Sequence, residues 1–414
     1  MSRAVTVIGI GDDGCVGLSS RAMNAVGRAQ VLVGGERHLA FFPQFAGERV
    51  LVKSGLPAVL DRVAELAHEN NVCVLASGDP LFFGIGALVV ARVGAAHVDI
   101  VPHASSIQLA FARVGLRWDD ATILSVHGKS PDGFVMRLRH ARKAGVLTDP
   151  ESSPARLATR MLEHGEAAWE AWVCENLGGA DERVRKFALP DLAQTTDVGS
   201  LNVLVLVRTD PAWREPPAIP YLHEDAFAKR MPKKGLITKR EVRCLSLAAM
   251  DIRRDSVVWD VGAGSGSVAI EAAMLAPFGR VYAVEVDPEG VAICRENTHA
   301  HGADNVTVVA GRAPEALADL EAPDSVFVGG SKGSMEDIVT VALDRLKPGG
   351  RLVVNAITLD NVGEAYRVLR GRGLTPEVTL LNVARGEPLA QYLRYEALNP
   401  IHIFAVTKTP GGDP

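Results

Sequence analysis

A glycine-rich stretch in the second half of the chain has the residue types and spacing of a ligand-binding turn. Residues 257–261 are apolar apart from Asp260, and glycines follow at alternate positions from Gly262 to Gly266. An amphipathic helix pattern then begins at Ser267. Glycines let a strand-to-helix turn bend tightly and let the backbone approach a ligand closely. The pattern therefore predicts a buried strand, a ligand-binding turn and a helix.

The charges around this turn favour S-adenosylmethionine (SAM) over a dinucleotide. A dinucleotide turn has the spacing G-x-G-x-x-G and binds a pyrophosphate at the helix N-terminus, but here Ser267 stands at the third glycine position. Asp260 would repel a pyrophosphate and attract the sulfonium and ammonium groups of SAM. The next predicted strand ends at Glu285, and an acid about 20 residues beyond the turn suits a pair of ribose hydroxyls. A plain βα turn with capping residues is the alternative.

Length and composition predict a globular protein with more than one domain. A chain of 414 residues exceeds one ordinary hydrophobic core, and its 47% hydrophobic content is typical of a folded protein. The formal net charge of -5 argues against a nucleic-acid partner. The five cysteines include no C-x-x-C pair, so we expect no metal site and a reducing, cytoplasmic location. No apolar run is long enough to span a bilayer, and we expect no membrane partner.

Alternating strand and helix patterns divide the chain into two α/β halves. In residues 1–208, β-branched runs alternate with helical stretches, as in a parallel sheet covered on both faces. Residues 168–208 at the end of this half indicate an antiparallel meander. Four prolines between residues 211 and 220 predict a linker over 209–222. A second α/β series with an antiparallel ending follows over residues 223–414.

Three sites at predicted helix starts have capping as one interpretation. The segment from Thr238 to Glu241 has capping-box spacing, which predicts a cap for a helix over residues 242–250. For Ser105, an N-cap is favoured over a ligand contact. Asp79 precedes a helix expected to begin near Leu81, so a cap is the alternative to a ligand role there.

Three segments of the first half place glycines, acids and hydroxyls after predicted strands. Residues 7–14 are glycine-rich, residues 76–86 read A-S-G-D-P-L-F-F-G-I-G, and residues 102–108 read P-H-A-S-S-I-Q. Open α/β sheets bind ligands at the carboxyl ends of their strands. The first segment alone is a weak signal, because a tight turn explains it equally well.

In this order and spacing, the three segments resemble the tetrapyrrole (corrin/porphyrin) methyltransferases. The resemblance implies an N-terminal two-lobed tetrapyrrole methylase fold, in which SAM lies in a cleft between two α/β lobes. It also implies that the G-D-P loop and the serine-rich turn contact SAM. The implied cofactor-binding residues are Ser77, Gly78, Asp79, Gly84, Ser105 and Ser106.

The second half, taken with the segment Pro232–Arg243, resembles the decarboxylating precorrin methyltransferases of cobalamin (vitamin B12) biosynthesis. The resemblance implies a C-terminal Rossmann-like class I SAM methyltransferase fold. Residues 311–315 match the adenine-side loop, and residues 326–331 match the end of the fourth strand. The cofactor-binding residues expected in this half are Thr238, Asp260, Gly262, Ala263, Gly264, Ser265, Gly266, Glu285 and Ala313.

The order of the two halves resembles fused precorrin methyltransferases. It implies methylation of precorrin-6Y at C5 and C15, with decarboxylation of the ring C (C12) acetate, to give precorrin-8X. Two nucleophilic carbons on one macrocycle account for two SAM sites on one chain. Because the conjugated macrocycle accepts electrons from the acetate, no cofactor beyond SAM is required.

A tetrapyrrole carries many carboxylates, so we expect amide and cationic donors to line its cleft. No residue is identified as the catalytic group for decarboxylation, and a surface charge is the alternative for each arginine. The expected partners are this small-molecule substrate and further copies of the chain in a homo-oligomer. The expected substrate-positioning residues are Gly330, Ser331, Lys332, Arg385 and Arg394.

Three other functions compete with this interpretation. A SAM-dependent methyltransferase acting on another tetrapyrrole or on RNA keeps the chemistry, but the acidic balance argues against RNA. A NAD-dependent oxidoreductase is disfavoured by Asp260 and Ser267. A SAM-binding scaffold without catalysis stays open for either half.

Overall fold

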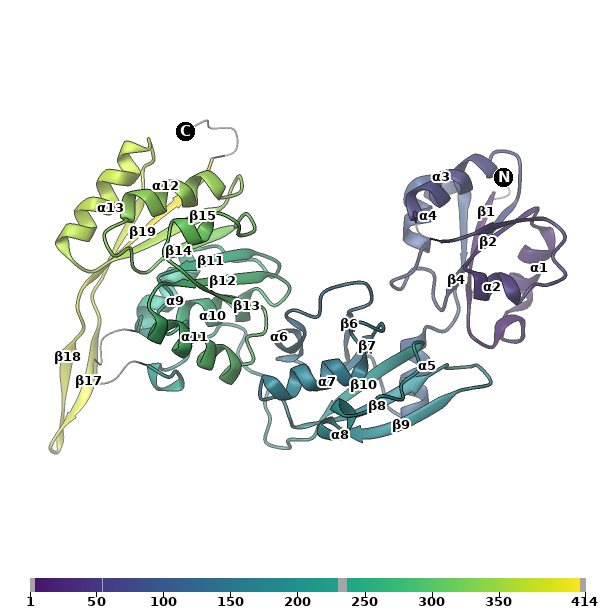
Figure 1. The fold of residues 1–414 in the computed structure, drawn as a ribbon, viewed down its shortest axis with the longest axis horizontal. Helices are drawn as coiled ribbons and strands as arrows, with labels where there is room; N and C mark the ends of the chain where they lie inside the picture. The colour runs from purple at the N-terminus through teal and green to yellow at the C-terminus, as the bar shows by residue number, and fades with distance from the viewer. Residues whose placement is uncertain (1–3, 54, 230–236, 410–414) are drawn as a thin grey trace. The chain divides into compact units, whose positions relative to one another are not determined.

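The computed structural model describes residues 4–53, 55–229 and 237–409, and it divides into two compact units (Figure 1). The first unit comprises the described residues up to Ser130 together with Ala141–Thr159 and Ala168–Pro211. The second comprises Pro131–His140, Arg160–Ala167 and the described residues from Ala212 onward. Among all these residues, we find no helix with the length and apolarity needed to cross a membrane.

The first unit begins with a five-stranded parallel sheet of order β3-β2-β4-β1-β5. The central strands β1 and β4 are almost wholly buried because apolar side chains pack on both faces of the sheet. The strands are β1 (Val5–Ile10), β2 (Val31–Gly34), β3 (Glu48–Leu51), β4 (Val72–Ser77) and β5 (Val98–Val101). The helices are α1 (Ser20–Arg28), α2 (Glu36–Ala40), α3 (Leu56–Leu66) and α4 (Gly86–Val93).

A second five-stranded sheet, of order β6-β7-β10-β8-β9, completes the first unit. Only β6 and β7 pair in parallel, and the other pairs are antiparallel, as predicted for residues 168–208. The predicted meander is wrong in its strand order, because β10 pairs with β8 and β7 and is not next to β9. The strands are β6 (Thr122–Ser125), β7 (Lys143–Leu147), β8 (Trp169–Glu175), β9 (Arg183–Ala188) and β10 (Asn202–Arg208). The helices between residues 106 and 193 are α5 (Ser106–Val114), α6 (Phe134–Leu138), α7 (Pro154–Glu163) and α8 (Leu189–Ala193), of which α6 and the end of α7 belong to the second unit.

The second unit contains a seven-stranded sheet of order β13-β12-β11-β14-β15-β19-β16. Its strands run parallel except for β19, which is antiparallel to both of its neighbours. Successive residues of β11 pack into clusters on opposite faces of the sheet. The strands are β11 (Val257–Val261), β12 (Arg280–Glu285), β13 (Val306–Ala310), β14 (Ser325–Val328), β15 (Arg351–Ala356), β16 (Glu377–Leu381) and β19 (Ile401–Thr407).

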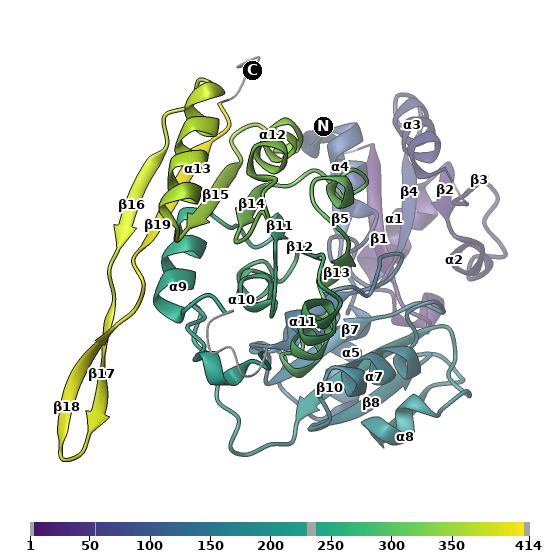
Figure 2. The same cartoon turned by 60° about the vertical axis from the view of Figure 1, so that its left-hand side comes forward.

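Helices cover both faces of this sheet, as the class I methyltransferase resemblance implies (Figure 2). The strand order reverses between β11 and β14, and such switch points are where open α/β sheets bind ligands. The helices are α9 (Arg240–Ala249), α10 (Ser267–Leu275), α11 (Pro288–Ala300), α12 (Met335–Arg345) and α13 (Leu359–Gly371).

A separate antiparallel hairpin lies between β16 and β19. Its strands are β17 (Ala384–Leu389) and β18 (Tyr392–Ala397), and it extends away from the seven-stranded sheet (Figures 1 and 2). Within these two strands only Arg385 is not exposed. The antiparallel pairing of β19 with β15 and β16 confirms the antiparallel ending expected from the sequence.

The structure corrects two local predictions. Helix α9 begins at Arg240, and Thr238 does not cap it, because Glu224 Oε1 accepts the Arg240 N–H at 2.8 Å. Helix α4 begins at Gly86, well after Leu81.

The favoured interpretation of Ser105 is confirmed. Its hydroxyl accepts the Gln108 N–H, and the Gln108 side chain accepts the Ser105 N–H, which forms a complete capping box for α5.

Two candidate ligand pockets

A cavity of about 620 Å³ opens at the carboxyl ends of the strands in the second unit. Its floor is the glycine turn after β11, and its sides come from the ends of β12, β14 and β15. Further walls come from the start of α9 and from the two segments that lead into the hairpin. The volume and the mixed polar and apolar lining are typical of a small-molecule site.

Glu285 is the carboxylate that lies closest to the glycine turn in this cavity. Its Oε2 accepts the Gly264 N–H and its Oε1 accepts the Asp287 N–H, each at 2.8 Å. The side chain is buried, yet it lines the cavity. Since each carboxylate oxygen has a second lone pair, Glu285 is already oriented to accept two further hydrogen bonds.

The turn itself requires glycine at its first position. Gly262 has a φ of 77°, and an added Cβ would lie 2.7 Å from the Gly330 carbonyl oxygen. The β11 turn and the β14 end therefore approach each other at backbone distance, which only a residue without a side chain allows.

Asp260 lies behind the turn and is not part of the cavity lining. It is 1% exposed, and its Oδ2 accepts the Ala269 N–H of α10 at 2.9 Å. Burial raises the pKa of Asp260 to about 7, against the opposing effect of the Ala269 hydrogen bond, and the nearby Glu285 charge raises it further. Asp260 therefore supports the turn and the first part of α10 from below.

The structure brings most of the other predicted cofactor residues to this cavity. Gly266 is instead the N-cap of α10, and a Cβ added there would lie 2.5 Å from Cys294 Sγ. Ala313 packs against the hydrophobic core on one face of the sheet. Part of the Pro232–Arg243 segment, residues 232–236, lies outside the described residues. The predicted residues that line the cavity are Thr238, Gly262, Ala263, Gly264, Ser265 and Glu285.

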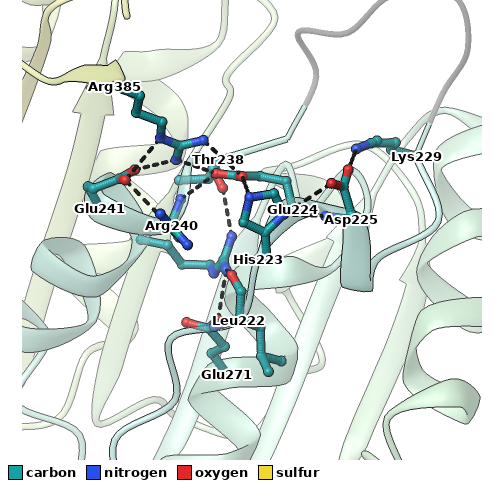
Figure 3. A network of polar contacts seen from close by, with 11 residues as sticks. Leu222, His223, Glu224, Asp225, Lys229, Thr238, Arg240, Glu241, Glu271 and Arg385 are labelled. Carbon is teal, nitrogen blue, oxygen red and sulfur yellow. Dashed lines mark hydrogen bonds and ion pairs between the residues drawn. The ribbon is translucent and has the colours of Figure 1, made fainter. Parts of the chain in front are cut away.

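The predicted substrate-positioning residues separate into different places. Lys332 lines the cavity, whereas Gly330 and Ser331 are not in its lining. Arg385 forms ion pairs with Glu224 and Glu241 outside the cavity (Figure 3). Arg394 is on the exposed strand β18, where its Nη2 lies 3.6 Å from Glu396 Oε2.

Several lining residues of this cavity were not predicted from the sequence. Asp287 lies two residues after Glu285, the last residue of β12, so its place in the cavity could have been predicted from the sequence. Asn355 at the end of β15 and Leu398 beside the hairpin come from distant parts of the chain, and no local pattern indicates them.

A second cavity, of about 630 Å³, lies within the first unit. Its walls come from the ends of β1 and β4, from the start of α5, and from β6, β7 and β10 of the other sheet. The cleft between two lobes implied by the family resemblance is therefore present. All six predicted residues line it: Ser77, Gly78, Asp79, Gly84, Ser105 and Ser106.

The G-D-P loop and the serine-rich turn are packed directly against each other. Gly78 has a φ of 60°, and a Cβ there would lie 3.1 Å from Ser105 Cα. Asp79 Oδ1 accepts the Leu81 N–H at 2.8 Å, which shapes a turn and leaves Oδ2 without a hydrogen bond in the described residues. Asp79 is thus not a helix cap, and it is one of the residues that line the cavity.

The opposite side of this cavity has polar groups that the sequence did not indicate. His127 and Lys129 belong to the turn after β6, which is fixed by a 2.6 Å hydrogen bond from the Gly128 N–H to Asp149.

His38 contacts Ser77 Oγ at 3.1 Å, and burial, followed by the charge of the adjacent arginine, lowers its pKa to about 4. His38 is therefore neutral at pH 7.

Both cavities suit SAM in the chemistry of their donors and acceptors. Each combines apolar walls, a glycine turn that permits close backbone approach and a carboxylate able to receive hydroxyl or ammonium groups. In the part of the chain that the structure describes, no group of three or more His, Cys, Asp or Glu side chains is arranged to bind a metal.

Comparison with known proteins gives a family match for each of the two units. Residues 4–193 match the family model of tetrapyrrole (corrin/porphyrin) methylases, and residues 229–408 match the precorrin methyltransferase domain. A Sinorhizobium relative, named precorrin-6Y C(5,15)-methyltransferase (decarboxylating), is 36% identical over 410 residues. That match covers 99% of this chain and 97% of the relative.

Two shorter relatives each match about half of the chain. A Methanothermobacter thermautotrophicus protein, named probable cobalt-precorrin-6B C(15)-methyltransferase (decarboxylating), is 39% identical over 44% of this chain and 93% of its own length. A Salmonella typhimurium protein, named cobalt-precorrin-7 C(5)-methyltransferase, is 34% identical over 49% of this chain and 98% of its own length.

The two folds and the two family models together define a tetrapyrrole methylase unit joined to a class I methyltransferase unit, with SAM as the methyl donor. The chain belongs to the family of decarboxylating precorrin-6Y C5,15-methyltransferases. The fold class and the family resemblance predicted from the sequence are thereby confirmed.

Proposed function

We propose that each unit has its own SAM site and its own reaction in cobalamin biosynthesis. The first unit methylates C5 of the precorrin, and the second methylates C15 and removes the ring C acetate carboxyl as carbon dioxide. The observation that carries this proposal is the pair of cavities, each built at the strand ends of a separate unit. The names of the two shorter relatives, one per reaction, support the division.

In the first unit, the six lining residues predicted from the sequence are proposed to contact SAM. SAM supplies a methyl group already activated on a sulfonium, so the protein has to orient the donor and exclude water. The Asp79 carboxylate attracts the positive charge of the donor. His127 and Lys129, on the opposite side of the cavity, are suitable donors for substrate carboxylates.

In the second unit, Glu285 is proposed to accept hydrogen bonds from the ribose hydroxyls, while the backbone of the glycine turn allows close approach. Lys332 is the proposed cation for a substrate carboxylate, with the amides of Gly330 and Ser331 beside it. Asp260 acts on the site through α10 and the turn, without contact. The electrons released by decarboxylation pass into the conjugated macrocycle of the substrate.

We also propose that the chain forms a homo-oligomer and acts in the cytoplasm. The hairpin β17–β18 exposes Leu389, Tyr392, Leu393 and Tyr395, and each of its strands has an outer edge unpaired in the sheet order. Exposed edges with apolar side chains favour pairing with another copy. Static light scattering tests the assembly, because Leu393→Asp should yield a smaller species.

The five cysteines are all free thiols, which supports the proposed reducing location.

A single-turnover assay tests the reaction. The protein is incubated with isotopically labelled SAM and precorrin-6Y, and the product is analysed by mass. Gain of two labelled methyl groups and loss of one carbon dioxide per macrocycle is the expected result. A labelled RNA or another tetrapyrrole as the better acceptor would contradict the proposal.

A further inference from the structure

Arg385 links the exposed hairpin of the second unit to helix α9 and to the segment before it. Within β17 and β18 only Arg385 is not exposed. The segments that enter and leave the hairpin also line the SAM-candidate cavity, with Val383 on one side and Ala397 and Leu398 on the other. The position of Arg385 therefore bears on the shape of the cavity.

Arg385 makes two-pronged contacts with two carboxylates (Figure 3). Its Nη1 and Nη2 donate to the two oxygens of Glu224 at 3.1 and 2.8 Å. Its Nε and Nη2 donate to the two oxygens of Glu241 at 3.0 and 2.5 Å. The planar guanidinium fits such forked contacts, which fix orientation as well as distance, and a lysine ammonium does not reproduce them.

These ion pairs are partly shielded from water. Glu224 is buried, and the side chains of Arg385 and Glu241 are each 21% exposed. Burial raises the pKa of Glu224, but hydrogen bonds from Arg385 and from the Arg240 N–H outweigh this and lower it to about 2. Arg385 and Glu224 are therefore both charged at neutral pH. Because they are partly shielded from water, their ion pair is stronger than one between exposed surface residues.

Both carboxylates lie at the start of α9, next to residues that line the cavity, although neither carboxylate lines it. Glu224 lies in the 3-10 helix η3 (Glu224–Ala226) and accepts the first N–H of α9, while Glu241 lies in the first turn of α9. Thr238 and Val242, on either side of that helix start, line the cavity. Arg385 thus bridges the hairpin wall and the α9 wall.

A second arginine connects the α9 wall to the glycine turn. Arg243 is fully buried and donates to the Thr238 carbonyl at 2.7 Å and to Glu271 Oε1 at 2.7 Å. Glu271 belongs to α10, the helix that follows the turn. The chain of contacts therefore runs from the hairpin through α9 to the helix of the glycine turn.

We propose that Arg385 is a positioning residue for the SAM site of the second unit, which joins the hairpin wall to the α9 wall through Glu224 and Glu241. This inference rests on the proposed function of that cavity as a SAM site. Arg385 touches neither cofactor nor substrate in this account. Its ion pairs keep Thr238, Val383 and Leu398 at the separation that SAM requires.

The test compares Arg385→Met with Arg385→Lys in the full chain. Carbon dioxide release reports the second unit, and methyl addition at C5 reports the first. Arg385→Met should raise the KM for SAM in carbon dioxide release by about tenfold or more, with a smaller change in kcat and with C5 methylation unchanged. Lysine retains the positive charge but cannot make the forked contacts. The KM for SAM of Arg385→Lys should therefore lie between those of the wild type and Arg385→Met.

Arg372→Met is the matched control. Arg372 forms a comparable ion pair with Asp344, at 2.5 Å and 27% exposed, and lies outside the cavity lining. It should leave the KM for SAM at the wild-type value. If Arg385→Met is too unstable to assay, Glu241→Gln removes one of the two ion pairs, and its KM for SAM should rise severalfold.

Two failures can be told apart. If Arg385→Met and Glu241→Gln keep the wild-type KM for SAM in carbon dioxide release, the positioning role is wrong while the SAM site stands. If the wild-type chain releases carbon dioxide without any dependence on SAM or binds none in the second unit, the proposed function itself is wrong.

Discussion

The two units contain cavities of similar size, each proposed to bind SAM, yet they build those cavities differently. In the first unit, short motifs that follow β4 and β5 supply all six predicted residues. In the second, the glycine turn supplies only the floor, and the walls depend on α9 and on segments beside a hairpin more than a hundred residues further along. A local motif therefore suffices to locate either site, but it describes the first more completely than the second.

The largest effect that the comparison predicts is at Asp79. Asp79→Ala should abolish methylation at C5 and leave C15 methylation and carbon dioxide release intact, because the cavity of the first unit loses the carboxylate of its G-D-P loop. The product mass, with one methyl fewer and the carboxyl still lost, is the measurement.

Asp79→Asn separates charge from turn geometry, since its amide oxygen still accepts the Leu81 N–H. It should be nearly as inactive at C5 as the alanine variant. Asp61→Ala, which removes a surface partner of Arg92, is the control. Normal C5 methylation by Asp79→Ala with a lower melting temperature would reduce Asp79 to a structural turn residue.

The next effect concerns the second unit alone. Glu285→Ala should weaken SAM binding at that site by roughly 1.5–3 kcal/mol, the range for hydrogen bonds to a charged group. The site of the first unit should bind as before. Calorimetric titration resolves the two, and an unchanged affinity at the second site would remove Glu285 from the ribose assignment.

A smaller and pH-dependent effect is expected at Asp260. Its pKa is raised to about 7 in the folded protein, so the unfolded chain releases the proton first. The free energy of unfolding should therefore fall as the pH rises from about 4 to about 7. Asp260→Asn abolishes this titration, and its amide oxygen still accepts the Ala269 N–H.

Thermal unfolding at pH 5 and pH 8 measures the difference. Asp260→Asn should gain stability relative to the wild type on going from pH 5 to pH 8, by on the order of 1–3 kcal/mol. An equal difference between the two proteins at both pH values would show that Asp260 is ionised throughout.

The sequence predicted what depends on neighbouring residues. The β11 glycine turn, the Ser105 cap and the G-D-P loop are short-range features, and their positions were readable from residue types alone. Thr238 was misread as a cap because the acceptor for α9 is Glu224, fourteen positions earlier than Thr238, on a segment with no regular pattern. Because the Glu224 carboxylate accepts the Arg240 N–H, the capping box predicted between Thr238 and Glu241 does not form.

Contacts between different elements of the fold explain the remaining differences. Arg385 was expected at the substrate because a tetrapyrrole carries carboxylates, but Glu224 and Glu241 occupy its guanidinium. Asp260 was expected beside the sulfonium, but the Ala269 N–H draws it beneath α10. Neither outcome follows from spacing, because each depends on which elements the fold places next to each other.

The number of SAM molecules bound per chain tests the central claim most directly. Equilibrium binding of labelled SAM to the full chain should give two sites, of which Glu285→Ala weakens one and Asp79→Ala weakens the other. A single site per chain, or two sites that both respond to the same substitution, would contradict the account of two independent methylation units.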